Sequence, residues 1–118
     1  MSRPLTAAEY ELTRWLLEHG KPEATNFLPQ LERAQASDWK CPCGCASFNF
    51  EIDGHEAPPG VNVLSDFVFG EGENLRGIFA FESKGLLSGV EVCGYAVDAP
   101  KALPTSAELR PIETAVAR

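Results

Sequence analysis

The apolar residues of this chain change their period from about 3.6 to 2 part-way along the sequence, and this change constrains the fold most strongly. Before it, Leu12 and Leu16 recur at helical spacing. After it, Phe48 and Phe50 alternate with polar residues, which predicts a half-buried strand. Helices followed by strands, in a chain of only 118 residues, predict a single α+β domain that takes up residues 1–118.

The N-terminal segment carries the signals of a capped helix over residues 6–19. Thr6 and Glu9 have the spacing of a capping box, in which each side chain binds the backbone N–H of the other residue. Gly20 is expected to end the helix by adopting the left-handed conformation, and Pro22 is expected to prevent its resumption.

A second apolar helical face runs through residues 22–36, but Pro29 interrupts it. A proline removes a backbone hydrogen bond and costs about 3 kcal/mol inside a regular helix. This segment is therefore expected either to kink near Thr25 or to form a short turn before a helix that starts around Leu28.

Four strands are expected in the rest of the chain, at residues 46–53, 63–69, 75–82 and 86–97. The connections between them are short, which favours an antiparallel meander. The two N-terminal helices are expected to cover the apolar face of this sheet, giving a two-layer α+β fold. The tail after Pro100 is expected to hold at most one helical turn, near residues 106–110.

Three thiols fall within the five-residue segment Cys41-Pro-Cys-Gly-Cys45, and a fourth, Cys93, lies on the last predicted strand. Structural zinc is held in a tetrahedron of thiolate or imidazole ligands. Cys41, Cys43, Cys45 and Cys93 are therefore candidate zinc ligands, although the usual Cys-x-x-Cys pairs are absent. His55 is a poor alternative, because an intervening strand would carry it about 26 Å from Cys45.

Three other interpretations of the cysteines remain open. A reactive thiolate needs a nearby cation or a helix N-terminus to lower its pKa, and Lys40 is the only adjacent base. Alternatively, Pro42 and Gly44 shape a tight turn in which small thiols pack as buried apolar groups. In an oxidising compartment, four cysteines would form disulfides in one of three pairings.

Negative charge is concentrated in one part of the chain. The chain has 10 basic and 17 acidic residues, a net charge of -7. Residues 41–100 contain two basic and nine acidic residues, and so account for all of this net charge. Such a region disfavours nucleic acid and anionic membranes as partners and favours a basic protein. The candidate partner-binding residues are Asp66, Glu71, Glu73 and Glu91.

The sequence lacks the motifs of common nucleotide-binding and hydrolytic enzymes, namely Gly-x-x-x-x-Gly-Lys-Ser/Thr, Gly-x-Ser-x-Gly and His-Glu-x-x-His. The chain is therefore expected to have no enzymatic activity. Its apolar runs are too short to span a bilayer, and its first residues lack the apolar core of a signal peptide. A cytoplasmic protein with reduced thiols is expected.

The opening segment from Arg3-Pro-Leu-Thr to Trp15-Leu-Leu-Glu-His-Gly20 resembles that of short uncharacterised bacterial proteins that begin with a capped helix. Those proteins commonly contain a strand similar to Leu87-Ser-Gly-Val-Glu-Val92, followed by a tail similar to residues 103–109. Some families of this appearance resemble immunity proteins, which bind and block a toxin without catalysis. The resemblance implies a binding role and transfers no site residues.

Two functions follow as hypotheses from these observations. The first is a small non-enzymatic module that binds a protein partner through an acidic surface of the β region. The alternative is a small domain with a structural zinc site, built on the Cys-Pro-Cys-Gly-Cys segment and Cys93.

Overall fold

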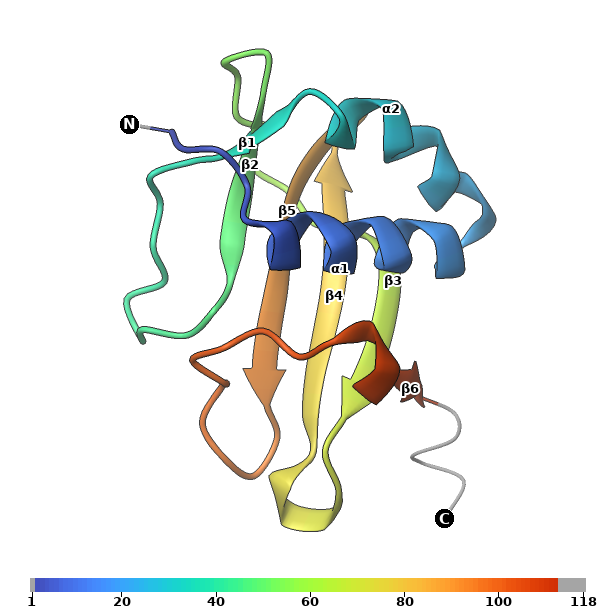
Figure 1. The fold of residues 1–118 in the computed structure, drawn as a ribbon, viewed down its shortest axis with the longest axis vertical. Helices are drawn as coiled ribbons and strands as arrows, with labels where there is room; N and C mark the ends of the chain where they lie inside the picture. Colours follow the sequence, from blue (N-terminus) through green and yellow to red (C-terminus); the bar gives the residue numbers. More distant parts are fainter. Residues whose placement is uncertain (1, 113–118) are drawn as a thin grey trace.

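The computed structural model describes residues 2–112 and is built on one antiparallel sheet in the order β1-β2-β5-β4-β3-β6 (Figure 1). The strands are β1 (Ala34–Ala36), β2 (Phe48–Ile52), β3 (Asn62–Phe69), β4 (Arg76–Ser83), β5 (Leu86–Gly94) and β6 (Arg110–Pro111). The helical elements are α1 (Ala7–His19) and α2 (Leu28–Leu31), with the 3-10 turns η1 (Pro22–Phe27), η2 (Gly72–Asn74) and η3 (Ser106–Glu108). The predicted α+β class is confirmed.

The sheet differs from the predicted four-stranded meander, which is wrong in strand number and in order. Strands β3, β4 and β5 do follow one another, but β2 pairs with β5, with Phe48 opposite Val90. Residues 53–61 carry the chain from β2 to β3 on the far side of β4, which is a Greek-key arrangement. The sequence pattern does not predict β1 and β6, because strands of three and two residues are too short to show a period.

Helix α1 is fixed at its start by the predicted capping box. The Thr6 hydroxyl accepts a hydrogen bond from the Glu9 backbone N–H at 3.1 Å, and the Glu9 carboxylate accepts one from the Thr6 N–H at 2.9 Å. The Arg3 guanidinium donates two hydrogen bonds of 2.8 Å to the same carboxylate. The N-terminal segment is thereby tied to the helix, and Leu16 and Leu17 are fully buried on the helix's inner side.

Gly20 ends α1 for a different reason from the one predicted. Its backbone is extended, with φ -89° and ψ -151°, and not left-handed. A Cβ atom at this position would lie 2.4 Å from both the Leu64 carbonyl oxygen and the Ser65 Cβ. The glycine is needed because the end of α1 approaches β3 too closely for a side chain. The adjoining Lys21 N–H donates to the Leu64 carbonyl at 2.8 Å.

The second helical segment, which contains Pro29, follows the second of the two predicted alternatives, a short turn before a helix. The turn η1 comes first, and α2 starts at Leu28 as expected. The helix lasts only four residues, because the chain extends again at Ala34 to form β1. The prediction that the helical face continues to residue 36 is therefore wrong, because residues 34–36 form a strand that pairs with β2.

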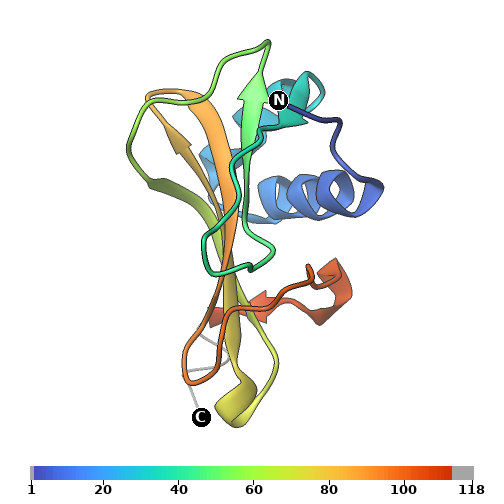
Figure 2. The same cartoon turned by 90° about the vertical axis from the view of Figure 1, so that its left-hand side faces the viewer.

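The helices lie on one face of the sheet, and the opposite face carries no helix in the described part of the chain (Figure 2). The core lies between the two layers. Its largest buried side chains from both layers are Leu16, Leu17, Leu31, Phe50, Leu64, Ile78, Leu87 and Val90. Among residues 2–112, no helix has the length and apolar character that crossing a membrane requires.

The capping network makes a prediction about pH. Hydrogen bonding to Arg3 is the main cause of the lowered pKa of Glu9, Thr6 contributes, and burial opposes the shift. Such a carboxylate stabilises the fold above its unfolded pKa of about 4.3 and loses this effect as the pH falls through its folded pKa. We expect Glu9→Gln to lower the free energy of unfolding at neutral pH and to flatten its decrease below about pH 4.3.

Urea unfolding followed at several pH values measures this difference. Glu11→Gln is the matched control, because Glu11 is exposed on the same helix and makes no ion pair within the described residues. Equal pH profiles for the two variants would contradict a special role for the buried carboxylate.

Candidate functional site

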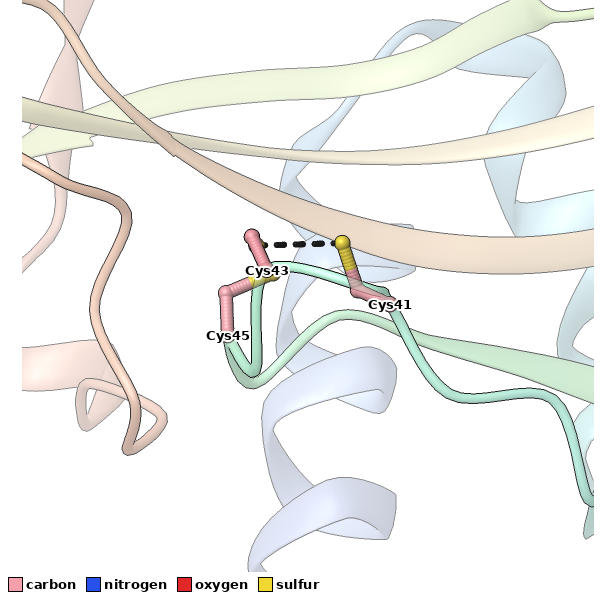
Figure 3. Close-up of side chains that lie close together, drawn as sticks. All are labelled: Cys41, Cys43 and Cys45. Atoms are coloured by element: carbon pink, nitrogen blue, oxygen red, sulfur yellow. Dashed lines mark hydrogen bonds between the residues drawn. The ribbon is translucent and has the colours of Figure 1, made fainter.

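The three clustered cysteines lie in the connection between β1 and β2. The Gly44 N–H donates to the Cys41 carbonyl at 2.9 Å, which closes a β-turn. Gly44 has a φ of +82°, a left-handed backbone conformation that residues with a side chain rarely adopt. This turn folds the short segment back on itself, so that the side chains of Cys41, Cys43 and Cys45 point toward one another (Figure 3).

The thiol groups form one compact cluster of potential metal ligands. The Sγ atoms of Cys41, Cys43 and Cys45 all lie within 4.8 Å of one another, and those of Cys41 and Cys43 are 3.1 Å apart. All of the cysteines are free thiols. Cys43 is exposed and the other two are half-buried. Cys45 packs against the core, so the interpretation of the cysteines as packing groups fits Cys45 but not the exposed Cys43.

The structure does not bring Cys93 into this cluster. It lies on β5 opposite Gly77, and its Sγ is 3.2 Å from the point that a Cβ on Gly77 would occupy. Because its neighbour Val92 points into the core, Cys93 faces the side of the sheet without helices. Burial raises the pKa of Cys93. The predicted four-cysteine ligand set is therefore reduced to three thiols among the described residues.

His55 also lies apart from the cluster, as expected. It is exposed in the turn after β2, where its backbone exchanges two hydrogen bonds with Ile52. The cysteines precede β2, so the length of this strand separates them from the imidazole. No described histidine or carboxylate joins the three thiols.

Interactions within the cluster give Cys41 and Cys45 different acidities. Hydrogen bonding with Cys43 is the main cause that raises the pKa of Cys41 to about 11. Burial raises the pKa of Cys45, but hydrogen bonding with Ser47, Cys43 and Cys41 outweighs burial and lowers it to about 7. Cys45 thus loses its proton more readily than Cys41, and the resulting charge on Cys45 further opposes ionisation of Cys41.

A surface cavity of about 620 Å³ adjoins the cluster and is lined by Cys41 and Cys45. Lys40 and Lys101 also line it, and the Lys101 ammonium lies 3.5 Å from the position that a Cβ on Gly44 would take. Two lysines therefore line the cavity beside the thiols, although the chain as a whole is acidic.

The four predicted partner-binding carboxylates fall into two groups. Asp66 and Glu91 flank Phe79 in one cross-strand row on the face of the sheet without helices, and both are exposed. Glu71 and Glu73 lie instead in the β3–β4 connection, at the tip of the hairpin. Figure 1 shows this tip projecting beyond the body of the sheet. The structure therefore brings only one pair together on the sheet.

Aromatic side chains on the same face were not among the predicted site residues. The rings of Phe79 and Phe81 lie 5.7 Å apart, and both are half-buried. Tyr95, which follows β5, is 59% exposed. The sequence signal is the unbroken apolar run Ile78–Phe81, because a strand that is apolar at successive positions presents apolar groups on both faces.

Comparison of the chain with protein-family models, with curated proteins and with solved structures gave no match. The roles of these residues therefore follow from their geometry and chemistry.

The unequal acidities make a prediction about thiol reactivity in chelator-treated protein. The thiolate is the nucleophile in alkylation, so the rate rises with pH through the thiol pKa. We expect iodoacetamide at neutral pH to modify Cys45 before Cys41, with a half-maximal rate for Cys45 near the pKa of about 7. Tandem mass spectrometry of timed samples locates the label. Protein unfolded in urea is the control, in which this order disappears; faster modification of folded Cys41 would contradict the assignment.

Proposed function

We propose that the protein binds a thiophilic metal ion, with zinc as the first candidate, through Cys41, Cys43 and Cys45. The observation that carries this proposal is the convergence of three free thiols within 4.8 Å of one another. Thiolates are ligands that zinc and copper(I) prefer. The five-residue segment supplies all three, so binding requires no distant part of the chain.

The electrostatics of the cluster support a bound cation. Hydrogen bonding with Cys43 is the main cause that raises the pKa of Cys41 to about 11, and negative charge on Cys45 adds to it, because thiolates this close repel one another. A divalent ion removes this repulsion and favours deprotonation of a coordinating thiol. Three protein ligands leave the fourth position of a tetrahedral ion to another ligand, as in zinc sites that bind substrates or water.

Zinc content tests the proposal directly. Protein purified without chelator is expected to carry about one equivalent of zinc, measured by elemental analysis with the protein concentration from amino-acid analysis. Chelator is expected to lower the melting temperature, because a ligand that binds only the folded state stabilises it. Cys43→Ser, at an exposed position, is expected to lose the metal.

Cys93→Ser is the matched control, because this thiol lies outside the cluster. It is expected to keep the full equivalent of zinc. Metal-free wild-type protein that cannot be loaded with zinc, with a melting temperature that chelator leaves unchanged, would rule the site out. Loss of zinc from Cys93→Ser alone would place the ligands elsewhere.

A second candidate function is recognition of a basic protein through the face of the sheet that the helices leave uncovered. The specific observation in its favour is the row in which Asp66 and Glu91 flank Phe79. Apolar rings bordered by carboxylates are suited to a partner that combines apolar side chains with lysine or arginine. The resemblance of the opening segment to immunity-type proteins makes a basic toxin surface the candidate partner.

This second proposal is tested with a displayed peptide library selected against the wild-type protein. Selected peptides are expected to be basic, and their affinity is expected to fall as salt increases. The double variant Asp66→Lys, Glu91→Lys is expected to lose this binding. Glu71→Lys, Glu73→Lys has the same change in net charge at the hairpin tip and is expected to keep most of it. Equal losses in both variants would mean that net charge, and not this face, governs binding.

A further inference from the structure

The cavity beside the cysteine cluster has the properties of a binding site for a small anion. Its volume of about 620 Å³ falls within the range of roughly 300–1,000 Å³ that is typical of small-ligand pockets. Cys41 and Cys45 line it, so a metal ion on the cluster would face the cavity. The half-exposed Trp39 provides an aromatic part of the lining.

The charged side chains that line the cavity carry net positive charge. The charge of Arg3 is balanced by the Glu9 carboxylate, to which it donates two hydrogen bonds. Lys40 and Lys101 form no ion pair with any carboxylate in residues 2–112. Two ammonium groups thus remain for an anionic ligand, in a chain whose net charge is -7.

A ligand that binds both the metal ion and the lysines of the cavity needs two different chemical groups in one molecule. A three-thiolate ion is soft and takes a further sulfur ligand readily, whereas lysine ammonium groups attract carboxylates. On the basis of the proposed metal site, we infer that the cavity binds a small thiol that bears carboxylates, whose sulfur becomes the fourth ligand of the ion.

The binding step balances without any oxidant or reductant. The ligand's thiol group loses its proton to solvent, and the resulting thiolate replaces a water molecule on the ion. A zinc ion with three cysteine thiolates has a net charge of -1, and the fourth thiolate makes it -2. The ammonium groups of Lys40 and Lys101 offset this added charge, which is the reason to expect them to matter for affinity.

Cobalt(II) substitution tests the inference, because the visible spectrum of tetrahedral cobalt reports the number of thiolate ligands. The probe is reduced glutathione, titrated into cobalt-loaded protein. We expect a stronger sulfur-to-cobalt charge-transfer band, a shift of the d–d bands and a change in tryptophan fluorescence, with the cobalt retained by the protein after desalting. S-methylglutathione, which has the carboxylates but no thiol, is expected to leave the cobalt bands unchanged.

Charge variants separate the cavity from the metal site. The double variant Lys40→Gln, Lys101→Gln is expected to bind cobalt as the wild type does but to bind glutathione roughly 2- to 20-fold more weakly, as expected for two partly exposed charge pairs. Lys84→Gln, in the β4–β5 turn, is the matched control and is expected to bind both normally.

The possible failures are distinguishable. Protein that binds neither cobalt nor zinc would overturn the metal site itself. Cobalt-loaded protein whose spectrum does not respond to glutathione, or that loses its cobalt to glutathione, would overturn only the ligand inference. An equal response to S-methylglutathione would show that the carboxylates bind without sulfur ligation, and would also overturn it.

Discussion

The pairing of β2 with β5 is the contact on which the remaining structure depends. It places Phe48 opposite Val90 and inserts β2 between β1 and the hairpin strands. The Ser47 hydroxyl reinforces it by accepting a hydrogen bond from the Val92 N–H at 3.0 Å. A Cβ on Gly89 would lie only 2.8 Å from the Phe48 carbonyl oxygen, so this close approach depends on glycine. Because the cysteine segment leads directly into β2, the pairing also determines where the thiols lie.

The fold class could be predicted from the sequence, because the period of the apolar residues is a local property. The capping box of α1 could be predicted because it too is local, and the start of α2 at Leu28 was one of two alternatives that the position of Pro29 left open. The strand order was not, since a pattern of alternation does not state which strand lies beside which. Gly20 was correctly expected at the helix end, but its cause is a close contact with β3 that no local rule contains.

In the candidate site, too, contacts between residues close in the sequence could be predicted, whereas contacts between distant residues could not. Three neighbouring cysteines are expected to lie close together, because a five-residue turn cannot separate them widely. Cys93 could not be excluded from sequence, since its distance from the cluster depends on the sheet. The net charge of residues 41–100 did not reveal the positive charge of the cavity. Lys101 lies outside this range in the sequence, but its ammonium group lies beside the Gly44 turn. An acidic protein thus has a basic cavity.

The order of synthesis adds a consequence to the Greek-key topology. The cysteine segment leaves the ribosome well before Val90, the residue that Phe48 needs as its partner. Until β5 has been made, the three-residue strand β1 is the neighbour in the sheet that is available to β2. The turn that holds the cysteines is built from adjacent residues, so it can form before β5 has been made. The three thiols can therefore come together before β2 gains its second neighbour in the sheet.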